Sequence, residues 1–237
     1  MLGVLGGMGP AAGAYFAYRL AQLTDAHCDQ DHLPVLLVND PQVPDRSEAA
    51  LGQGRSPLPA MLRGLRLLES GGCRGVAMPC NTAHCWFDDL QASIQMPLLH
   101  IVSASVQALR DQGVDGGKIG LLGTPATVAS GLYQSQLQRA GYEVLPLSDD
   151  EVQRHCVAPI HAVKQGRPEA AGKALALALD ALHRRGAHAV ILGCTELPLA
   201  HAALGAAAAA LTVIDSIDAL AISALNHFGY AVKQPHA

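Results

Sequence analysis

Two cysteines of this sequence lie in similar local sequences, 114 positions apart. Cys80 follows the apolar segment 76–79 and precedes Asn-Thr, and Cys194 follows the apolar segment 190–193 and precedes Thr-Glu. Two acid/base groups on opposite sides of one carbon can invert its configuration, because one removes a proton while the other delivers one. We therefore interpret Cys80 and Cys194 as equivalent catalytic thiols, one from each half of a duplicated chain, that act on one substrate.

The two thiols need different protonation states to do this chemistry. A free thiol has a pKa of about 8.5, so the thiol that serves as base must be shifted to a lower pKa. Each cysteine is expected at the end of a strand and just before a helix, where backbone N–H groups and the helix dipole favour the thiolate. Asn81, Thr82 and Thr195 supply amide and hydroxyl donors beside the sulfur atoms, and such donors can hold a substrate carboxylate.

The elements that must position these residues are short apolar strands alternating with helical patterns. The segment 2–5 is followed by a glycine-rich turn at 6–10 and a helical pattern to about Leu23, and the same order restarts at 119–124. Continuously apolar strands separated by helices predict an α/β fold with parallel sheets covered on both faces. Because the pattern occurs twice, we expect two pseudo-symmetric doubly wound lobes. Ligands of such sheets bind outside the carboxyl ends of strands, where both glycine turns and both cysteines are expected.

The overall composition excludes several classes of protein. The chain has 237 residues, of which half are hydrophobic, and a net charge of −4 without a basic block, so a nucleic-acid partner is not expected. Six cysteines without a CxxC pair do not form a disulfide framework. Residues 1–18 are uncharged apart from the chain terminus, yet no basic segment precedes Gly3 and glycines interrupt the run, so we expect neither a signal peptide nor a membrane helix. A cytoplasmic protein with reduced thiols is the plain expectation.

Three other sequence patterns give weaker evidence for a functional site. Cys80, His84 and Cys85 lie within one to two helical turns, but no second cluster supplies further ligands, so we expect no metal. His84 either tunes Cys80 or is a helix-face histidine with a satisfied hydrogen bond, and we favour the second. The turn 6–10 is not GxGxxG and lacks the Lys-Ser/Thr of a phosphate-binding loop, so nucleotide binding is not expected. The segment 40–59 is expected to be a long, functional loop, and 202–210 a helix.

On these residues the chain resembles the aspartate/glutamate racemase family, the cofactor-independent two-cysteine amino-acid racemases, and is most similar to its aspartate racemases. The resemblance covers nearly the whole chain. It is carried by the turn 6–10, Pro-Asp-Arg-Ser at 44–47, Cys-Asn-Thr-Ala-His at 80–84, the segment 124–130 and Gly-Cys-Thr-Glu at 193–196. It implies a PLP-independent isomerase without cofactor, commonly a homodimer, with its site between the lobes. It also implies that the C-terminal segment returns to the first lobe, which gives domains of 1–97 plus 210–237 and of 98–209.

The resemblance also implies roles for individual residues. The acid/base cysteines fall on Cys80 and Cys194, while Arg46 and Lys164 fall where the aspartate-selective members hold the side-chain carboxylate. Glu196 either binds substrate or orients its neighbours. The expected substrate-binding residues are Met8, Arg46, Asn81, Thr82, Thr124, Thr127, Lys164, Thr195 and Glu196.

The expected function is therefore interconversion of L- and D-aspartate, with glutamate as a further substrate. Glutamate racemases usually carry Thr-His after the second cysteine, whereas Thr195 precedes Glu196 here. Isomerases and racemases of another dicarboxylate or of hydantoins, such as maleate isomerases, also keep two cysteines and remain an alternative. A non-catalytic two-lobed protein that binds a small anion is the alternative from a different class.

Overall fold

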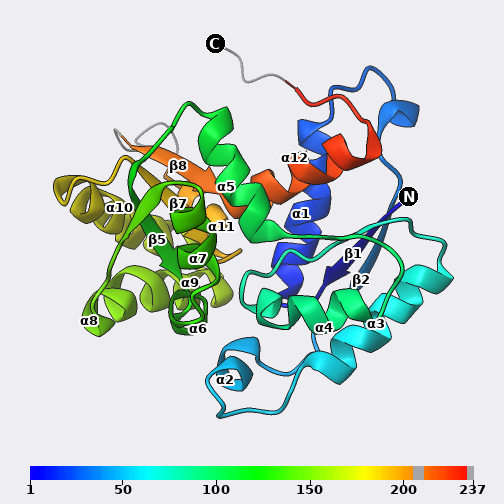
Figure 1. Ribbon diagram of the computed structural model, residues 1–237, viewed down its shortest axis with the longest axis horizontal. Coiled ribbons are helices and arrows are strands. Elements are labelled where there is room, and N and C mark those ends of the chain that lie inside the picture. Colours follow the sequence, from blue (N-terminus) through cyan, green and yellow to red (C-terminus); the bar gives the residue numbers. More distant parts are fainter. Residues whose placement is uncertain (205–210, 234–237) are drawn as a thin grey trace. The chain divides into compact units, whose positions relative to one another are not determined.

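The structure is a computed structural model that describes residues 1–204 and 211–233 (Figure 1). The chain divides into two compact units, the first made of 1–104 with 217–233 and the second of 105–216. Each unit holds a four-stranded sheet, with the order β2-β1-β3-β4 in the first and β6-β5-β7-β8 in the second. All pairs within both sheets are parallel. The predicted pair of similar doubly wound α/β lobes is confirmed.

The first sheet is built around β1, whose five residues are all buried. The chain goes from β1 to β2 on one side and returns to β3 on the other, so right-handed crossovers place α1 and α3 on opposite faces. The elements are β1 (Leu2–Gly6), α1 (Pro10–Leu23), η1 (Asp29–Asp31), β2 (Val35–Asn39), α2 (Arg46–Ala50), α3 (Leu58–Ser70), β3 (Val76–Ala77), η2 (Thr82–Trp86), α4 (Phe87–Ala92), β4 (Leu98–Leu99) and α5 (Ile101–Asp111).

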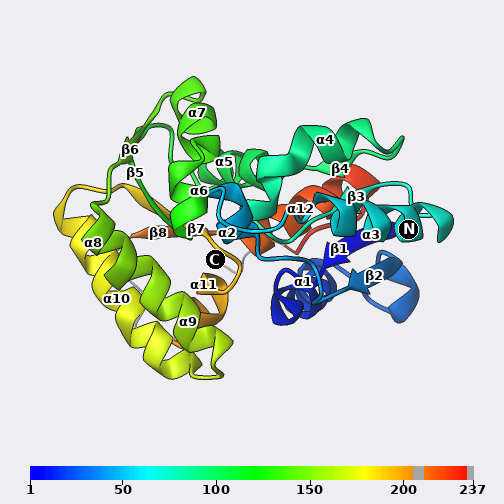
Figure 2. The ribbon, with the colours of Figure 1, turned by 90° about the horizontal axis from the view of Figure 1, so that it is seen from below.

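The second sheet repeats this plan around β5 and β7, and β7 is buried along its whole length. Figure 2 shows α8, α9 and α10 on one side of this sheet and α6 and α7 on the other. The elements are β5 (Gly117–Gly123), α6 (Pro125–Ala129), α7 (Leu132–Arg139), β6 (Tyr142–Leu145), α8 (Asp149–Val152), the π-helical turn η3 (Gln153–Val157), α9 (Ala158–Lys164), α10 (Pro168–Arg184), β7 (Ala189–Gly193), α11 (Leu197–Ala202) and β8 (Thr212–Asp215).

The C-terminal helix α12 (Ser216–Phe228) belongs to the first unit from Ile217 onward. Arg19 on α1 forms a part-buried ion pair with Asp218, with 2.6 Å between Nε and Oδ1. After the helix, the Asp25 N–H donates to the Ala231 carbonyl at 2.9 Å, and the Lys233 N–H donates to the Leu23 carbonyl at 2.8 Å. The last described residues are thus attached to the first helix of the chain.

Several segments differ from the sequence-based expectations. The segment 40–59 contains α2, which Asp45 caps by accepting from the backbone N–H groups of Ser47 and Glu48. β4 pairs with β3 and β8 pairs with β7, so residues 98–99 lie in the first sheet and 212–215 in the second. The first unit therefore extends to residue 104 and not to the expected residue 97, because β4 is the fourth strand of the first sheet. The boundary expected at 209/210 and most of the helix expected at 202–210 lie outside the described residues.

No helix in the described ranges 1–204 and 211–233 is long and apolar enough to cross a membrane.

His84 joins two segments of the first unit. Its ring is buried, Nδ1 lies 2.8 Å from the Cys80 carbonyl oxygen, and the Ile101 N–H at the start of α5 donates to Nε2 at 3.1 Å. A carbonyl can only accept, so Nδ1 carries the proton and Nε2 is the acceptor. The favoured reading of His84, a helix-face histidine with satisfied hydrogen bonds, is confirmed. Burial, together with nearby His100, lowers the pKa of His84 to about 3, so the ring is neutral.

We expect His84 to make the stability of the protein fall in acid. The pKa of His84 is about 3 in the folded chain and 6.5 for an ordinary histidine, so the folded state resists protonation and stability declines as the pH falls below 6.5. His84→Asn should lower the free energy of unfolding by about 1–3 kcal/mol at pH 7.5, because the Ile101 N–H loses its acceptor.

Urea unfolding at pH 7.5 and pH 5 measures this effect. The native protein and His84→Asn should differ in free energy of unfolding by about 2 kcal/mol less at pH 5 than at pH 7.5, because only the native chain carries the titrating ring. His183→Asn, on the exposed end of α10, is the control and should leave the difference constant. An equal gap for His84→Asn at both pH values would contradict the assignment.

Candidate active site

Cys80 lies just beyond the carboxyl end of β3, next to the turn that follows β1. Its side chain is 6% exposed and belongs to the same buried cluster as Met8. The turn brings the chain close to the end of β2, because a Cβ on Gly7 would lie 2.1 Å from the Asp40 carbonyl oxygen and φ is +88°. Glycine is therefore required at this position, and Met8 directly after it belongs to the same buried cluster as Cys80.

Polar groups surround Cys80 on the chain that follows it and on α2. Asn81 and Thr82 are buried at the start of η2, and α2 packs against η2. Arg46, at the start of α2, uses Nη1 to donate to the carbonyls of Val43 at 3.1 Å and Pro44 at 3.0 Å. Its Nε is buried and finds no hydrogen-bond partner among the described residues. A fixed guanidinium with an unused donor is suited to holding a carboxylate.

Cys194 occupies the equivalent place beyond the carboxyl end of β7. Its side chain is 5% exposed, and its thiol donates a hydrogen bond to Oε2 of Glu196 at 3.1 Å. The hydroxyl of Thr195 donates to the same carboxylate oxygen at 3.4 Å. Glu196 is itself only 7% exposed.

The charges around Cys194 favour the protonated thiol. Burial, and then the negative charge of Glu196, raise the pKa of the Cys194 thiol well above its usual value, while Lys164 at the end of α9 acts in the opposite direction. Lys164 makes no ion pair with any described residue, so its charge is available to a bound anion. Tyr133 on α7 is fully buried near Cys194, and its pKa is raised by burial. The sequence carries no local signal that Tyr133 lies here.

Thr124 and Thr127 lie beside Cys194 because β5 and β7 are neighbouring strands. Gly123 and Gly193 are paired at the ends of these strands. Thr124 caps α6 by accepting from the backbone N–H of Thr127 at 3.1 Å, and the two hydroxyl oxygens are 3.0 Å apart. Thr127 is fully buried.

The expected site residues thus form two groups, each within one unit. Cys80 is accompanied in the first unit by Met8, Arg46, Asn81 and Thr82, and Cys194 in the second by Thr124, Thr127, Lys164, Thr195 and Glu196.

The other four cysteines differ in exposure. Cys28 and Cys85 are exposed, whereas Cys73 and Cys156 are buried. Cys156 faces the core from the π-helical turn, and burial raises the pKa of its thiol to about 11.

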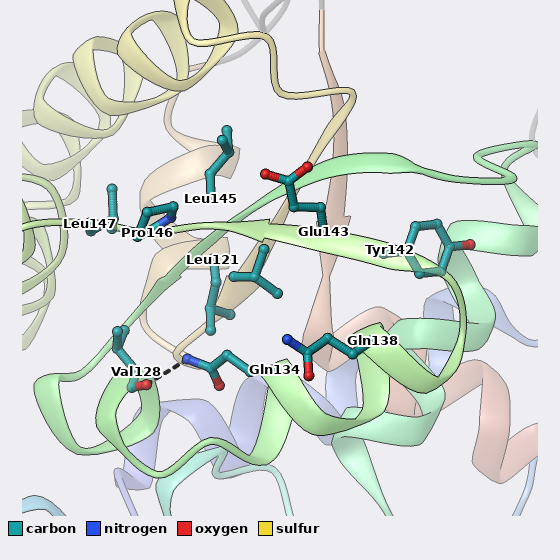
Figure 3. Close-up of a pocket in the computed structure, with 10 residues that line it drawn as sticks. Leu121, Val128, Gln134, Gln138, Tyr142, Glu143, Leu145, Pro146 and Leu147 are labelled. Carbon is teal, nitrogen blue, oxygen red and sulfur yellow. Dashed lines mark hydrogen bonds between the residues drawn. The ribbon is translucent and has the colours of Figure 1, made fainter.

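A separate cavity of about 500 Å³ lies over β6 and α7 (Figure 3). Leu121, Leu145 and Leu147 form much of its wall, and Gln134 donates from its amide to the Val128 carbonyl at 2.7 Å. Neither cysteine nor any of the expected substrate-binding residues lines it. This cavity is therefore distinct from the site around Cys194.

The sequence and the fold of the chain resemble those of known racemases. A family model described as Asp/Glu/Hydantoin racemase matches residues 5–224. The broad specificity amino-acid racemase RacX of Bacillus subtilis is 28% identical over 232 residues, which cover 96% of this chain and 98% of that protein. A glutamate racemase of Aquifex pyrophilus is 31% identical over 174 residues, covering 67% and 60% of the two chains. The structure of Picrophilus torridus aspartate racemase aligns with a TM-score of 0.85 and 33% identity, covering 98% and 95% of the two chains. The chain therefore belongs to the Asp/Glu/Hydantoin racemase family.

Proposed function

We propose that this protein is a cofactor-independent racemase that interconverts L- and D-aspartate and accepts glutamate as a secondary substrate. The observation that carries the proposal is the occurrence of two buried thiols, Cys80 and Cys194, at equivalent strand ends of two similar units. Membership of the racemase family and the similarity to an aspartate racemase support the same reaction.

In the proposed reaction, the thiolate of one cysteine removes the α-proton and the thiol of the other delivers a proton to the opposite face. Negative charge that develops as the Cα–H bond breaks spreads into the substrate carboxylate. The side-chain donors of Asn81 and Thr82 and the backbone N–H of Thr195 hold that carboxylate. The mechanism requires that both thiols reach one α-carbon.

Preference for a dicarboxylic substrate is assigned to Arg46 and Lys164. Two positive groups accompany the cysteines, the guanidinium of Arg46 and the ammonium group of Lys164. Within the described part of the chain, the Arg46 Nε has no hydrogen-bond partner and Lys164 forms no ion pair. A second carboxylate on the substrate would satisfy them. We further propose that the protein acts as a homodimer in the cytoplasm, which light scattering and cell fractionation would test.

Replacing either cysteine should abolish racemisation, because each direction needs one base and one acid. Cys80→Ala and Cys194→Ala are each expected to lose racemase activity by at least about a hundredfold, a typical contribution of a positioned acid or base. Each variant should still exchange the α-hydrogen of one enantiomer, measured by NMR in heavy water with separate D- and L-aspartate.

The matched control is Cys85→Ala, which removes an exposed thiol five residues after Cys80. It should racemise at the native rate. Tight binding of aspartate by the native protein without deuterium at Cα would instead identify an anion-binding protein. Exchange confined to a hydantoin or another dicarboxylate would identify the alternative isomerase.

Arg46→Met should weaken turnover of aspartate more than turnover of an amino acid without a side-chain carboxylate. A hydrogen bond to a charged group contributes about 1.5–3 kcal/mol, so kcat/KM for aspartate is expected to fall about tenfold to a hundredfold. Alanine is the comparison substrate, and the exposed Arg55→Met is the control variant. Equal losses for aspartate and alanine would show that Arg46 does not recognise the side chain.

A further inference from the structure

We propose that Glu196 is the proton acceptor of Cys194, so that this cysteine becomes a base by passing its proton to the neighbouring carboxylate. The inference rests on the proposed racemase function and assigns a specific role to a residue within it. Glu196 would act through Cys194 and is therefore a positioning and proton-holding residue of that thiol.

The geometry for the transfer is already present. The Cys194 thiol donates to Oε2 of Glu196 at 3.1 Å, and both side chains are more than nine-tenths buried. Thr195 donates to the same oxygen and so fixes the orientation of the carboxylate. The S–H bond breaks as the O–H bond forms, and the pair keeps one proton and one negative charge. The transfer therefore changes the charge distribution within the pair without changing its total charge.

The charged and titratable groups near Cys194 explain why a local acceptor is needed. Glu196 follows it in the chain, Lys164 approaches from α9, Tyr133 lies on α7, and Asp215 at the end of β8 acts on Tyr133. Burial and the Glu196 charge raise the pKa of the Cys194 thiol, so the thiol stays protonated near neutral pH. Tyr133 is a protonated phenol because burial raises its pKa, so it cannot take the proton. Among the side chains that the structure describes, only Glu196 accepts a hydrogen bond from the Cys194 thiol.

The two directions of racemisation then use Glu196 differently. When Cys194 is the base, its proton first moves to Glu196, the thiolate takes the α-proton, and Cys80 protonates the other face. Glu196 afterwards releases its proton to solvent and the Cys80 thiolate takes one up. When Cys80 is the base, its thiol first releases a proton to solvent. Cys194 then donates its own proton to the substrate and is reprotonated by solvent, while Glu196 stays ionised. Removal of the α-proton from one enantiomer of the substrate therefore depends on Glu196 far more than removal from the other.

Glu196→Gln tests this role because it keeps the size of the side chain and removes the proton acceptor. The enantiomer that depends on Cys194 as base is identified first, as the one whose α-hydrogen exchange is lost in Cys194→Ala. For this enantiomer, exchange by Glu196→Gln should fall about a hundredfold at pH 7. It should then rise about tenfold per pH unit up to pH 9, because solvent hydroxide must now remove the thiol proton. The native rate should vary much less over this range.

Exchange of the opposite enantiomer should change less than about threefold in Glu196→Gln, because Cys80 is the base in that direction. Glu196→Asp should restore part of the lost direction and flatten its pH profile. Glu169→Gln, on the exposed first turn of α10, is the control and should match the native protein. An equal loss for both enantiomers, with an unchanged pH profile, would overturn the proposal.

A second measurement does not depend on turnover. Iodoacetamide labelling of Cys194, followed by peptide mass spectrometry across pH, reports when this thiol ionises. The midpoint should move to lower pH in Glu196→Gln, because a negative charge beside the thiol has been removed. An unchanged midpoint would refute the proposed role of Glu196 but would leave the proposed racemase function intact. Absence of α-hydrogen exchange by the native protein would refute the racemase function, even if the labelling midpoint moves.

Discussion

The structure depends on one constraint, namely that a parallel strand covered on both faces can carry almost no polar side chain along its length. All residues of β1 and β7 are buried, and their backbone groups are paired with neighbouring strands. A buried polar group without a partner costs free energy, so reactive side chains are confined to the places where these strands end. Both cysteines lie just beyond such ends. The buried core and the position of the two thiols are thus two results of the same arrangement.

Duplication of the fold places the two thiols on equivalent strands but in different chemical surroundings. In the first unit, His84 binds the backbone carbonyl of Cys80 and ties it to α5, while Arg46 supplies positive charge near η2. In the second unit, Glu196 binds the thiol of Cys194 directly. The backbone of Cys80 is thus tied to α5, and the thiol of Cys194 is bonded to a neighbouring carboxylate. In the proposed reaction the two cysteines alternate between acid and base although their environments differ.

Much of this fold follows from patterns that are local in the sequence. Apolar segments ending in glycine or cysteine predict the strands, and their recurrence predicts two similar sheets. The short helix α2 was missed because Asp45 stabilises it within a segment rich in proline and glycine. The assignment of β4 and β8 to sheets depends on pairing between distant segments, which periodicity does not report.

The site was predictable to a similar extent. Residues adjacent to the cysteines in the chain, such as Asn81 and Thr195, are found beside them because few bonds separate them. The contact between Glu196 and the Cys194 sulfur depends on side-chain orientation, which spacing alone does not determine. Tyr133 approaches Cys194 from a helix some 60 residues earlier in the chain, where its neighbours resemble those of any amphipathic helix.

The attachment of α12 to α1 has a consequence for synthesis on the ribosome. The second unit is one continuous stretch, 105–216, and all of its strands and helices are available once that stretch has emerged. Synthesis of the first unit begins earlier, but Arg19 cannot form its ion pair with Asp218 until Asp218 has been translated. Domains commonly mature in the order in which they are made. In this chain the second unit can finish folding while the first still waits for its last helix, so the order of completion is reversed.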